Sequence, residues 1–287
     1  MKKQNTLGSV YRTLSIELTG IGIDSPQLEA RILIAYAAKI EQTRIIGYPE
    51  DKLDDITIAH LKKITKRRKN GEPIAHITGA KEFWSLNFSI NKETLIPRPD
   101  SEILIEAILS VIANYQCPLS ILDLGTGSGC LLLALLSELP NATGVGIDIS
   151  SAACRIAEKN SEYLGLSGRA KFYRGNWMNN IYDKFDIIIS NPPYIAESCI
   201  KFLDKEVRLY EPHIALSGGH DGLSAYRQIA KESVSRLKSA GILAVEIGIN
   251  QKKNISDIFI KNGLNIIKIR RDHSNIERCI LATVELS

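Results

Sequence analysis

The sequence predicts an α/β protein with a mostly parallel sheet, preceded by a small helical domain. From Ser120 onward, short β-rich runs alternate with segments of helical periodicity, the pattern of parallel strands joined by helices. Two more β-rich runs near the C-terminus favour an antiparallel hairpin at the sheet edge. The N-terminal part shows helical spacing instead. We expect a helical domain over residues 1–73, a hairpin linker over 74–97 and the α/β domain over 98–287.

Capping signals mark two helices of the N-terminal domain. Ser25-Pro26 predicts a helix start, and the following buried face is expected to carry four residues at helical spacing: Leu28, Ile32, Tyr36 and Ile40. Residues 53–69 predict a helix that ends at Asn70-Gly71. Its tail, 62–69, carries six basic residues in eight, which indicates either a solvated face or a docking surface for an acidic partner or nucleic acid.

The linker and the residues after it have their own signals. The period changes to two over 74–79 and 86–90, so these two stretches are expected to pair as the hairpin. In Leu95-Ile-Pro-Arg-Pro-Asp-Ser-Glu102, the prolines on either side of Arg98 hold it in an extended chain. Arg98 is therefore either a surface charge or a contact to substrate or loop. Asp100 or Ser101 is expected to cap a helix over 103–112.

Seven strands are expected in the main sheet. The parallel part is predicted at 120–124, 144–148, 170–174, 185–190 and 241–247, and the edge hairpin at 265–271 and 279–285.

Composition is that of an ordinary globular protein. The 287 residues are 44% hydrophobic with a net charge of +4, which permits an acidic partner without requiring one. No apolar run is long enough to cross a bilayer, and the N-terminus lacks the pattern of a signal peptide, so we expect a cytoplasmic protein. The five cysteines are scattered and predict buried free thiols. No histidine or cysteine pair has metal spacing, so no metal site is expected.

The most informative stretch is Asn191-Pro192-Pro193-Tyr194, directly after an apolar strand. Two prolines cannot continue a ladder of hydrogen bonds, so the strand must stop where open α/β sheets bind ligands. The Asn191 side-chain oxygen and the Pro192 carbonyl oxygen are acceptors that match the two hydrogens of a planar –NH2 group. Tyr194 can lie flat against that group. An ordinary strand ending with an Asn in a turn is the competing interpretation.

A glycine loop follows the first strand of the sheet. Its residues are Gly125, Thr126, Gly127, Ser128 and Gly129, and Asp123 precedes it. Glycines let a ligand approach the backbone closely. The spacing G-x-G-x-G differs from the dinucleotide pattern, and a carboxylate at Asp123 disfavours a pyrophosphate and suits a cationic or zwitterionic ligand. Alternatively, Asp123 only orders the loop.

The next two strand ends offer further ligand contacts. Asp148 lies at the position where an acidic residue holds ribose hydroxyls, with a helix N-cap as the alternative. Asn176 and Trp177 are provisionally assigned to the edge and face of an adenine, with core packing as the alternative for Trp177. Together with an –NH2 clamp, these groups describe S-adenosylmethionine as cofactor and a nitrogen acceptor.

In these motifs the chain resembles the HemK/PrmC family of release-factor glutamine methyltransferases. The resemblance rests on the Leu95–Glu102 block, the loop 123–129, Asn191–Tyr194 and the shorter matches Glu206-Val207, Glu211-Pro212, Asp221–Leu223, Glu246–Gly248 and Gln251. It implies a class I S-adenosylmethionine-dependent methyltransferase fold and methylation of the glutamine in the Gly-Gly-Gln loop of class 1 peptide chain release factors. The N-terminal helices would bind the factor. Asn176 stands where the family commonly has Asp, His76 replaces a common Tyr, and 272–278 diverges.

Within this resemblance, Asn191, Pro192 and Tyr194 are the expected catalytic residues. Asn191 to Tyr194 and Arg98 are expected to contact the substrate, and Asn191 also the cofactor. Three alternatives stay open: an amino-methyltransferase acting on nucleic acid or on a ribosomal-protein glutamine, a binding module without catalysis, and a dinucleotide oxidoreductase. A separate base-reading module is not evident, so no stable nucleic-acid partner is expected.

Overall fold

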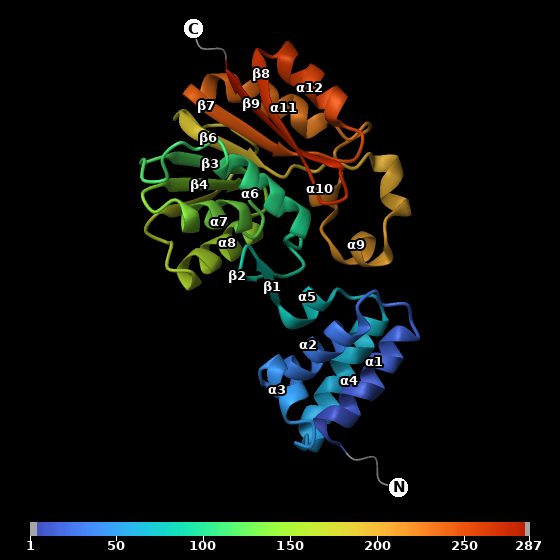
Figure 1. Ribbon diagram of the computed structural model, residues 1–287. Helices are drawn as coiled ribbons and strands as arrows, with labels where there is room; N and C mark the ends of the chain where they lie inside the picture. Colours follow the sequence, from blue (N-terminus) through green and yellow to red (C-terminus); the bar gives the residue numbers. More distant parts are fainter. Residues whose placement is uncertain (1–4, 285–287) are drawn as a thin grey trace. The chain divides into compact units, whose positions relative to one another are not determined.

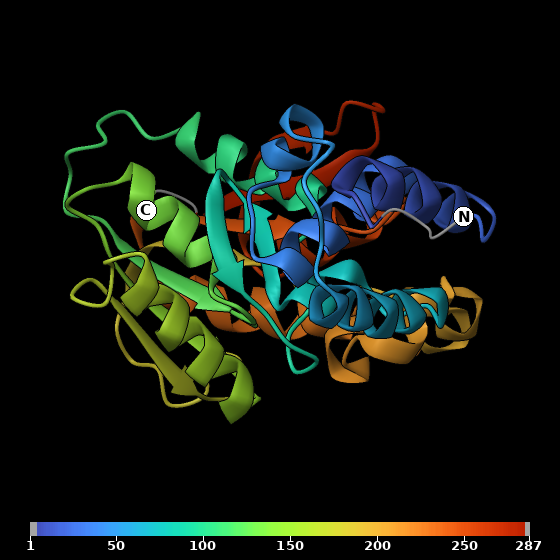
Figure 2. The same cartoon turned by 90° about the horizontal axis from the view of Figure 1, so that it is seen from below.

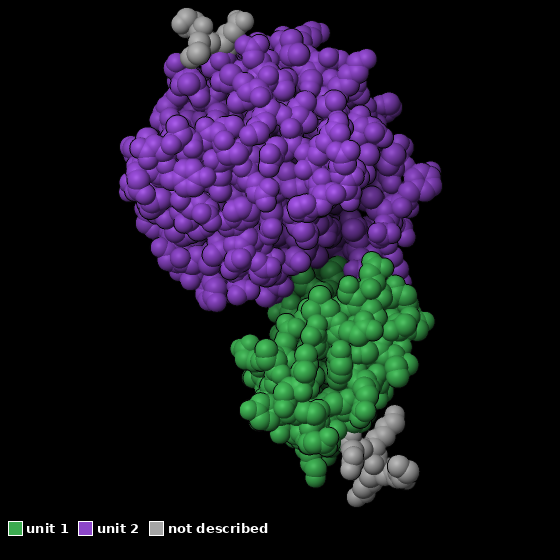
Figure 3. Space-filling model, in the orientation of Figure 1, with its two compact units in different colours: residues 1–79 green, residues 80–287 purple. Residues whose placement is uncertain are grey.

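The structure, a computed structural model, describes residues 5–284 and divides the chain into two compact units, residues 1–79 and 80–287 (Figure 3). Each unit has its own hydrophobic core. Among the described residues, none of the helices combines the length and apolar character that crossing a bilayer requires.

The first unit is helical, as expected. Its helices are α1 (Leu7–Thr19), α2 (Pro26–Ala38), α3 (Gln42–Gly47), α4 (Asp55–Lys69) and α5 (Ile74–Thr78) (Figure 1). Thr6 and Asp54 cap α1 and α4 by accepting hydrogen bonds from Ser9 N and Thr57 N. Pro26 occupies the first turn of α2, where its missing N–H costs nothing.

The predicted buried face of α2 is wrong. Leu28 and Tyr36 are 44% and 41% exposed, and the helix instead buries Ala30, Leu33, Ile34, Ala35 and Ala37. Small residues on this face let α2 pack closely against α1 and α4. The prediction followed large apolar residues spaced four apart, and it therefore placed the buried face of α2 about one position away from the observed one.

Half of the basic run 62–69 forms ion pairs within the unit. Arg68 is buried and binds Glu29 at 2.5 Å, Arg67 binds Glu72 at 2.6 Å, and Lys69 binds Glu17 at 2.7 Å. Lys62, Lys63 and Lys66 are exposed. The run therefore stabilises the helical unit through one half and leaves three lysines at the surface.

The expected hairpin is present, but its first strand is not where the sequence placed it. Residues 74–78 form α5, which ends at Gly79 in the left-handed conformation at φ 72°. The pairing strands are β1 (Ala80–Phe83) and β2 (Leu86–Ser89), drawn as teal arrows in Figure 2. Five residues between Pro73 and Gly79 are too few for a period of two to be told from one helical turn.

The second unit is built on a seven-stranded sheet with the order β5-β4-β3-β6-β7-β9-β8. Its strands are β3 (Ser120–Leu124), β4 (Thr143–Asp148), β5 (Ala170–Arg174), β6 (Phe185–Ser190), β7 (Leu237–Glu246), β8 (Leu264–Arg271) and β9 (Glu277–Val284). Strands β3 to β7 are parallel, and β9 pairs antiparallel with β7 and β8. The predicted mostly parallel sheet with an antiparallel edge hairpin is confirmed.

Helices cover both faces of this sheet (Figure 1). On one face lie α6 (Glu102–Leu109), α7 (Cys130–Glu138) and α8 (Ser151–Tyr163), and on the other α11 (Ser224–Arg236) and α12 (Lys252–Lys261). The connections add η1 (Pro99–Ser101), η2 (Glu197–Phe202), α9 (Lys205–Tyr210) and α10 (His213–Leu216). Strand β6 is central and almost fully buried, which explains its continuous apolar run.

Two smaller expectations are wrong. Neither Asp100 nor Ser101 caps α6 through its side chain: Asp100 binds Arg278 at 2.8 Å, and the Ser101 hydroxyl is used elsewhere. The five cysteines are free, but only Cys154 and Cys279 are buried, and Cys199 is exposed.

Candidate active site

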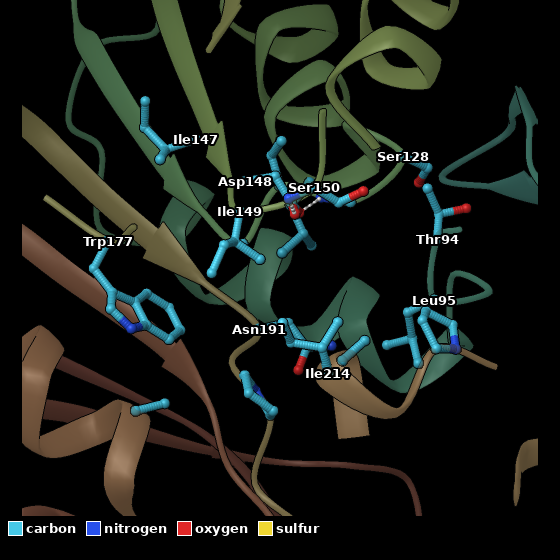
Figure 4. A pocket seen from close by; sticks show the side chains of 18 of the residues that line it. Thr94, Leu95, Ser128, Ile147, Asp148, Ile149, Ser150, Trp177, Asn191 and Ile214 are labelled. Atoms are coloured by element: carbon cyan, nitrogen blue, oxygen red, sulfur yellow. Dashed lines mark hydrogen bonds between the residues drawn. The ribbon is translucent and has the colours of Figure 1, made fainter. Parts of the chain in front are cut away.

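The carboxyl ends of β3, β4, β5 and β6 open onto a cavity of about 580 Å³ in the second unit. In Figure 4, Asp148, Trp177 and Asn191 surround the open space, with Thr94, Leu95 and Ile214 on its other sides. Parallel strands end at the same edge, so side chains far apart in sequence meet there.

The glycine loop after β3 needs its glycines. Gly125, Gly127 and Gly129 have φ values of 71°, 56° and 80°, a backbone region that other residues rarely adopt. At Gly129 a Cβ would also lie 3.0 Å from the Cβ of Ala157 on α8. The loop thus lies against α8 and presents Gly125, Thr126, Gly127 and Ser128 to the cavity.

Beneath the loop lies a buried carboxyl group with spare hydrogen-bonding capacity. Asp123 Oδ2 accepts the Thr126 hydroxyl at 2.6 Å, whereas Oδ1 and the Ser128 hydroxyl are buried without a partner among the described residues. Burial raises the pKa of Asp123 to about 7, against the lowering effect of Thr126. Such unsatisfied polar atoms fit a polar, positively charged ligand on the loop.

Asp148 ends β4 and orders the loop from the other side. Its carboxylate accepts hydrogen bonds from Gly127 N at 2.9 Å and Ser150 N at 2.8 Å, and burial raises its pKa. Ser150, not Asp148, caps α8, since its hydroxyl accepts from Ala153 N. Because each carboxylate oxygen has two lone pairs, Asp148 keeps acceptor capacity toward the cavity.

Gly175, Asn176 and Trp177 continue from β5 along the cavity wall. Trp177 has a φ of 51°, packs with one part against the sheet core and lines the cavity with the rest. The Trp177 side chain thus contributes to core packing and is also accessible from the cavity, and its contact with an adenine stays a prediction. Asn176 is exposed at the cavity rim.

Asn191, the first residue after β6, has a fixed amide orientation. Its Nδ2 donates to the Ser101 hydroxyl oxygen at 3.1 Å, and that hydroxyl donates to Glu246 Oε2 at 2.5 Å. No described residue donates to Asn191 Oδ1 or to the Pro192 carbonyl oxygen. Both acceptors are therefore unengaged within the described chain, and of the two residues Asn191 lines the cavity.

The rest of the tetrapeptide is held from behind. Gln251 Nε2 donates to the Tyr194 carbonyl oxygen at 2.9 Å, and its Oε1 accepts from Gly248 N at 3.0 Å. The Tyr194 ring packs against the sheet core, and burial raises its pKa.

Most of the predicted site residues line the cavity, Pro193 among them. Four predicted site residues in the described chain do not line it: Asp123, Gly129, Pro192 and Tyr194.

Arg98 lines the cavity and forms an ion pair with Glu211. The Glu211 side chain is 1% exposed, and burial raises its pKa despite the guanidinium beside it. Arg98, 36% exposed, thereby joins the Leu95–Glu102 block to the connection after β6 while its remaining N–H groups stay available.

Sequence reasoning assigned no role in the site to Ser101, Glu211 or Glu246, although all three lie in matched motifs, and it considered Ser101 only as a helix cap. The available signal was a carboxylate in an otherwise apolar strand end, Val245-Glu246-Ile247. A buried carboxylate of this kind is costly unless partnered. Its partner could not be read from the sequence, because Ser101 is 145 positions away.

Comparisons with known proteins show the family to which the chain belongs. Residues 9–79 match the family model of the PrmC N-terminal domain, and residues 100–204 match that of the methyltransferase small domain. The release factor glutamine methyltransferase of Caulobacter vibrioides is 39% identical over 96% of both chains. That of Agrobacterium fabrum is 39% identical over 92% of both.

Solved structures share the fold. The hMettl16 catalytic domain has a TM-score of 0.56 at 17% identity, covering 77% of this chain and 84% of that one. A methyltransferase from Pyrococcus furiosus has a TM-score of 0.51 at 15% identity, covering 77% and 98%. The second unit is thus a class I methyltransferase fold with S-adenosylmethionine as methyl donor, and the chain belongs to the family of release factor glutamine methyltransferases.

Proposed function

We propose that the protein transfers a methyl group from S-adenosylmethionine to the side-chain amide nitrogen of the glutamine in the Gly-Gly-Gln motif of class 1 peptide chain release factors. The observation that carries this proposal is the orientation of Asn191, whose Nδ2 is bound to Ser101 while Oδ1 remains free. The family relationship supports the choice of substrate.

The methyl donor would lie across the strand ends. The loop of Gly125, Thr126, Gly127, Ser128 and Gly129, with Asp123 beneath it, would hold the charged amino-acid part. Asp148 would accept hydrogen bonds from the ribose hydroxyls, and Asn176 and Trp177 would contact the adenine edge and face. Bound S-adenosylmethionine supplies an electrophilic methyl group on a sulfonium.

The work of the chain in the reaction is positioning and charge stabilisation. Asn191 Oδ1 and the Pro192 carbonyl oxygen would each accept one hydrogen of the substrate amide. This fixes the nitrogen lone pair toward the methyl group and stabilises the positive charge that develops on nitrogen. Pro193 and Tyr194 would support the planar amide, and Arg98 would contact the substrate backbone. The methylated amide then loses a proton readily, so no base is required beforehand.

The domains would have separate roles. The N-terminal helical domain, residues 1–73, would bind the release factor, with 74–97 as linker and 98–287 as the methyltransferase domain. The substrate is a translation factor, so the reaction is assigned to the cytoplasm, and no stable nucleic-acid partner is needed.

Methyl transfer from labelled donor tests this assignment. Purified release factor should incorporate one methyl group, mapped by tandem mass spectrometry to the glutamine amide, and a factor with Glu in place of that glutamine should incorporate none. Parallel reactions with DNA, tRNA and ribosomal proteins test the alternative substrates. Labelling of one of these in place of the release factor would overturn the proposal.

A further inference from the structure

Glu246 is a buried carboxyl group beside Asn191. In the parallel register of β6 and β7, Ser190 pairs with Val245, so the next residues, Asn191 and Glu246, are neighbours at the strand ends. Glu246 is 3% exposed, and its backbone oxygen is fixed by the Tyr226 hydroxyl at 2.8 Å. Its Oε2 accepts the Ser101 hydroxyl at 2.5 Å.

The ionised carboxylate gives the chain of hydrogen bonds a direction. A carboxylate has only acceptors, so the single hydroxyl hydrogen of Ser101 must point to Glu246. The Ser101 oxygen can then offer Asn191 only a lone pair, which binds Nδ2 and cannot bind Oδ1. The neighbouring Asn191 amide also lowers the pKa of Glu246, as expected when Nδ2 faces the carboxylate. This effect and the Ser101 contact favour the same amide orientation.

Protonation of Glu246 would remove this direction. A neutral carboxyl group can donate to the Ser101 oxygen, which frees the Ser101 hydrogen to bind Asn191 Oδ1 after rotation of the amide. Burial raises the pKa of Glu246 to about 7. The charged and titratable groups around it come from η1, α7, α11, β9 and the segment after β6: Asp100, Cys130, Tyr226, Arg278, Cys279 and Tyr194. Arg278 lowers this pKa and Asp100 raises it.

We propose that ionised Glu246 is a positioning residue which, through the Ser101 hydroxyl, keeps the Asn191 side-chain oxygen directed at the substrate amide. The inference deepens the proposed function, because it explains how the acceptor of that reaction is held. It assigns Glu246 no contact with substrate or donor.

A measurement without turnover tests the orientation directly. The Asn191 side-chain amide resonances, assigned in ¹⁵N-labelled protein by their loss in Asn191→Asp, should shift with pH around the Glu246 pKa of about 7. Glu246→Gln should abolish that titration. Asp123, which also has a raised pKa, serves as control: Asp123→Asn should leave the titration in place. Resonances that titrate unchanged in Glu246→Gln would overturn the inference.

Measurements of kcat and of the donor Kd provide a second test. A glutamine at 246 can donate as well as accept, so Glu246→Gln should lower kcat about 10- to 100-fold and leave the donor Kd within about twofold. The acid limb of the wild-type kcat profile near the Glu246 pKa should disappear. Glu106→Gln is the matched control, since it makes the same change on the exposed side of α6 and should keep wild-type turnover.

Ser101 variants complete the test. Ser101→Ala should lower kcat like Glu246→Gln, the double variant should be no worse than either, and Ser101→Thr should recover most of the turnover. Thermal unfolding identifies any variant that fails to fold. Wild-type kcat and an intact acid limb in Glu246→Gln would overturn the inference and leave the proposed function standing. A wild-type protein that does not methylate release factor would overturn the function, while the resonance titration would still decide the inference.

Discussion

The amide nitrogen of Asn191 donates to the hydroxyl oxygen of Ser101, a residue 90 positions earlier in the chain. This contact joins the end of the central strand to the Leu95–Glu102 block, two motifs that the sequence presents separately. It leaves the amide oxygen of Asn191 as a free acceptor at the cavity. The first prediction follows from this acceptor.

Asn191→Ala should lower turnover by a much larger factor than it weakens binding of the methyl donor. The side chain acts on the substrate amide, and loss of one preorganised hydrogen-bond partner of a transition state typically costs about 10²–10³-fold in kcat. Single-turnover methylation and calorimetric donor binding give the two quantities. Asn179→Ala, an exposed asparagine after β5, is the control. Equal losses in kcat and donor affinity would contradict the clamp.

Asp148→Ala should mainly raise the donor Kd, by about 10- to 100-fold, because a charge-assisted hydrogen bond to ribose contributes roughly 1.5–3 kcal/mol. A donor analogue lacking the ribose hydroxyls separates this contact from loop disorder. The wild-type protein should bind the analogue more weakly than the natural donor. The Asp148→Ala variant should bind the analogue and the natural donor with about equal affinity. Exposed Asp183→Ala should behave as wild type. An analogue penalty that persists in Asp148→Ala would remove Asp148 from the ribose site.

Donor binding should quench the fluorescence of Trp177. The chain has two tryptophans, and the other, Trp84, lies in the β1–β2 turn, where its indole donates to Glu138 at 2.7 Å. Trp84→Phe therefore leaves Trp177 as the reporter, and its emission should fall when an adenine stacks on the indole. Trp177→Phe should remove the response. A full response in Trp177→Phe would show that the adenine lies elsewhere.

The sequence predictions were accurate where a structural feature is determined by neighbouring residues in the chain, and they failed where it depends on contacts between distant residues. The bounds of β3, β5 and β6 are those predicted. β3 and β6 are buried and mostly apolar, whereas the edge strand β5 alternates buried Ala170 and Phe172 with exposed residues. The short segment 74–78 was misread because one turn has no resolvable period. The Glu246 contact required the register of β6 on β7, a property of the folded sheet alone.

Asp123 should release a proton when the donor binds. Its pKa is about 7 in the folded protein, against an ordinary value of 3.8, so between these pH values the folded state holds a proton that the unfolded state has lost. Stability should therefore fall as pH rises through this window. A bound sulfonium and ammonium favour the ionised carboxyl group and lower its pKa. At pH near 6.5, calorimetry in buffers of different ionisation enthalpy should show release of most of one proton. The release should vanish well above pH 7 and in Asp123→Asn. Unchanged release in Asp123→Asn would assign the proton to another group.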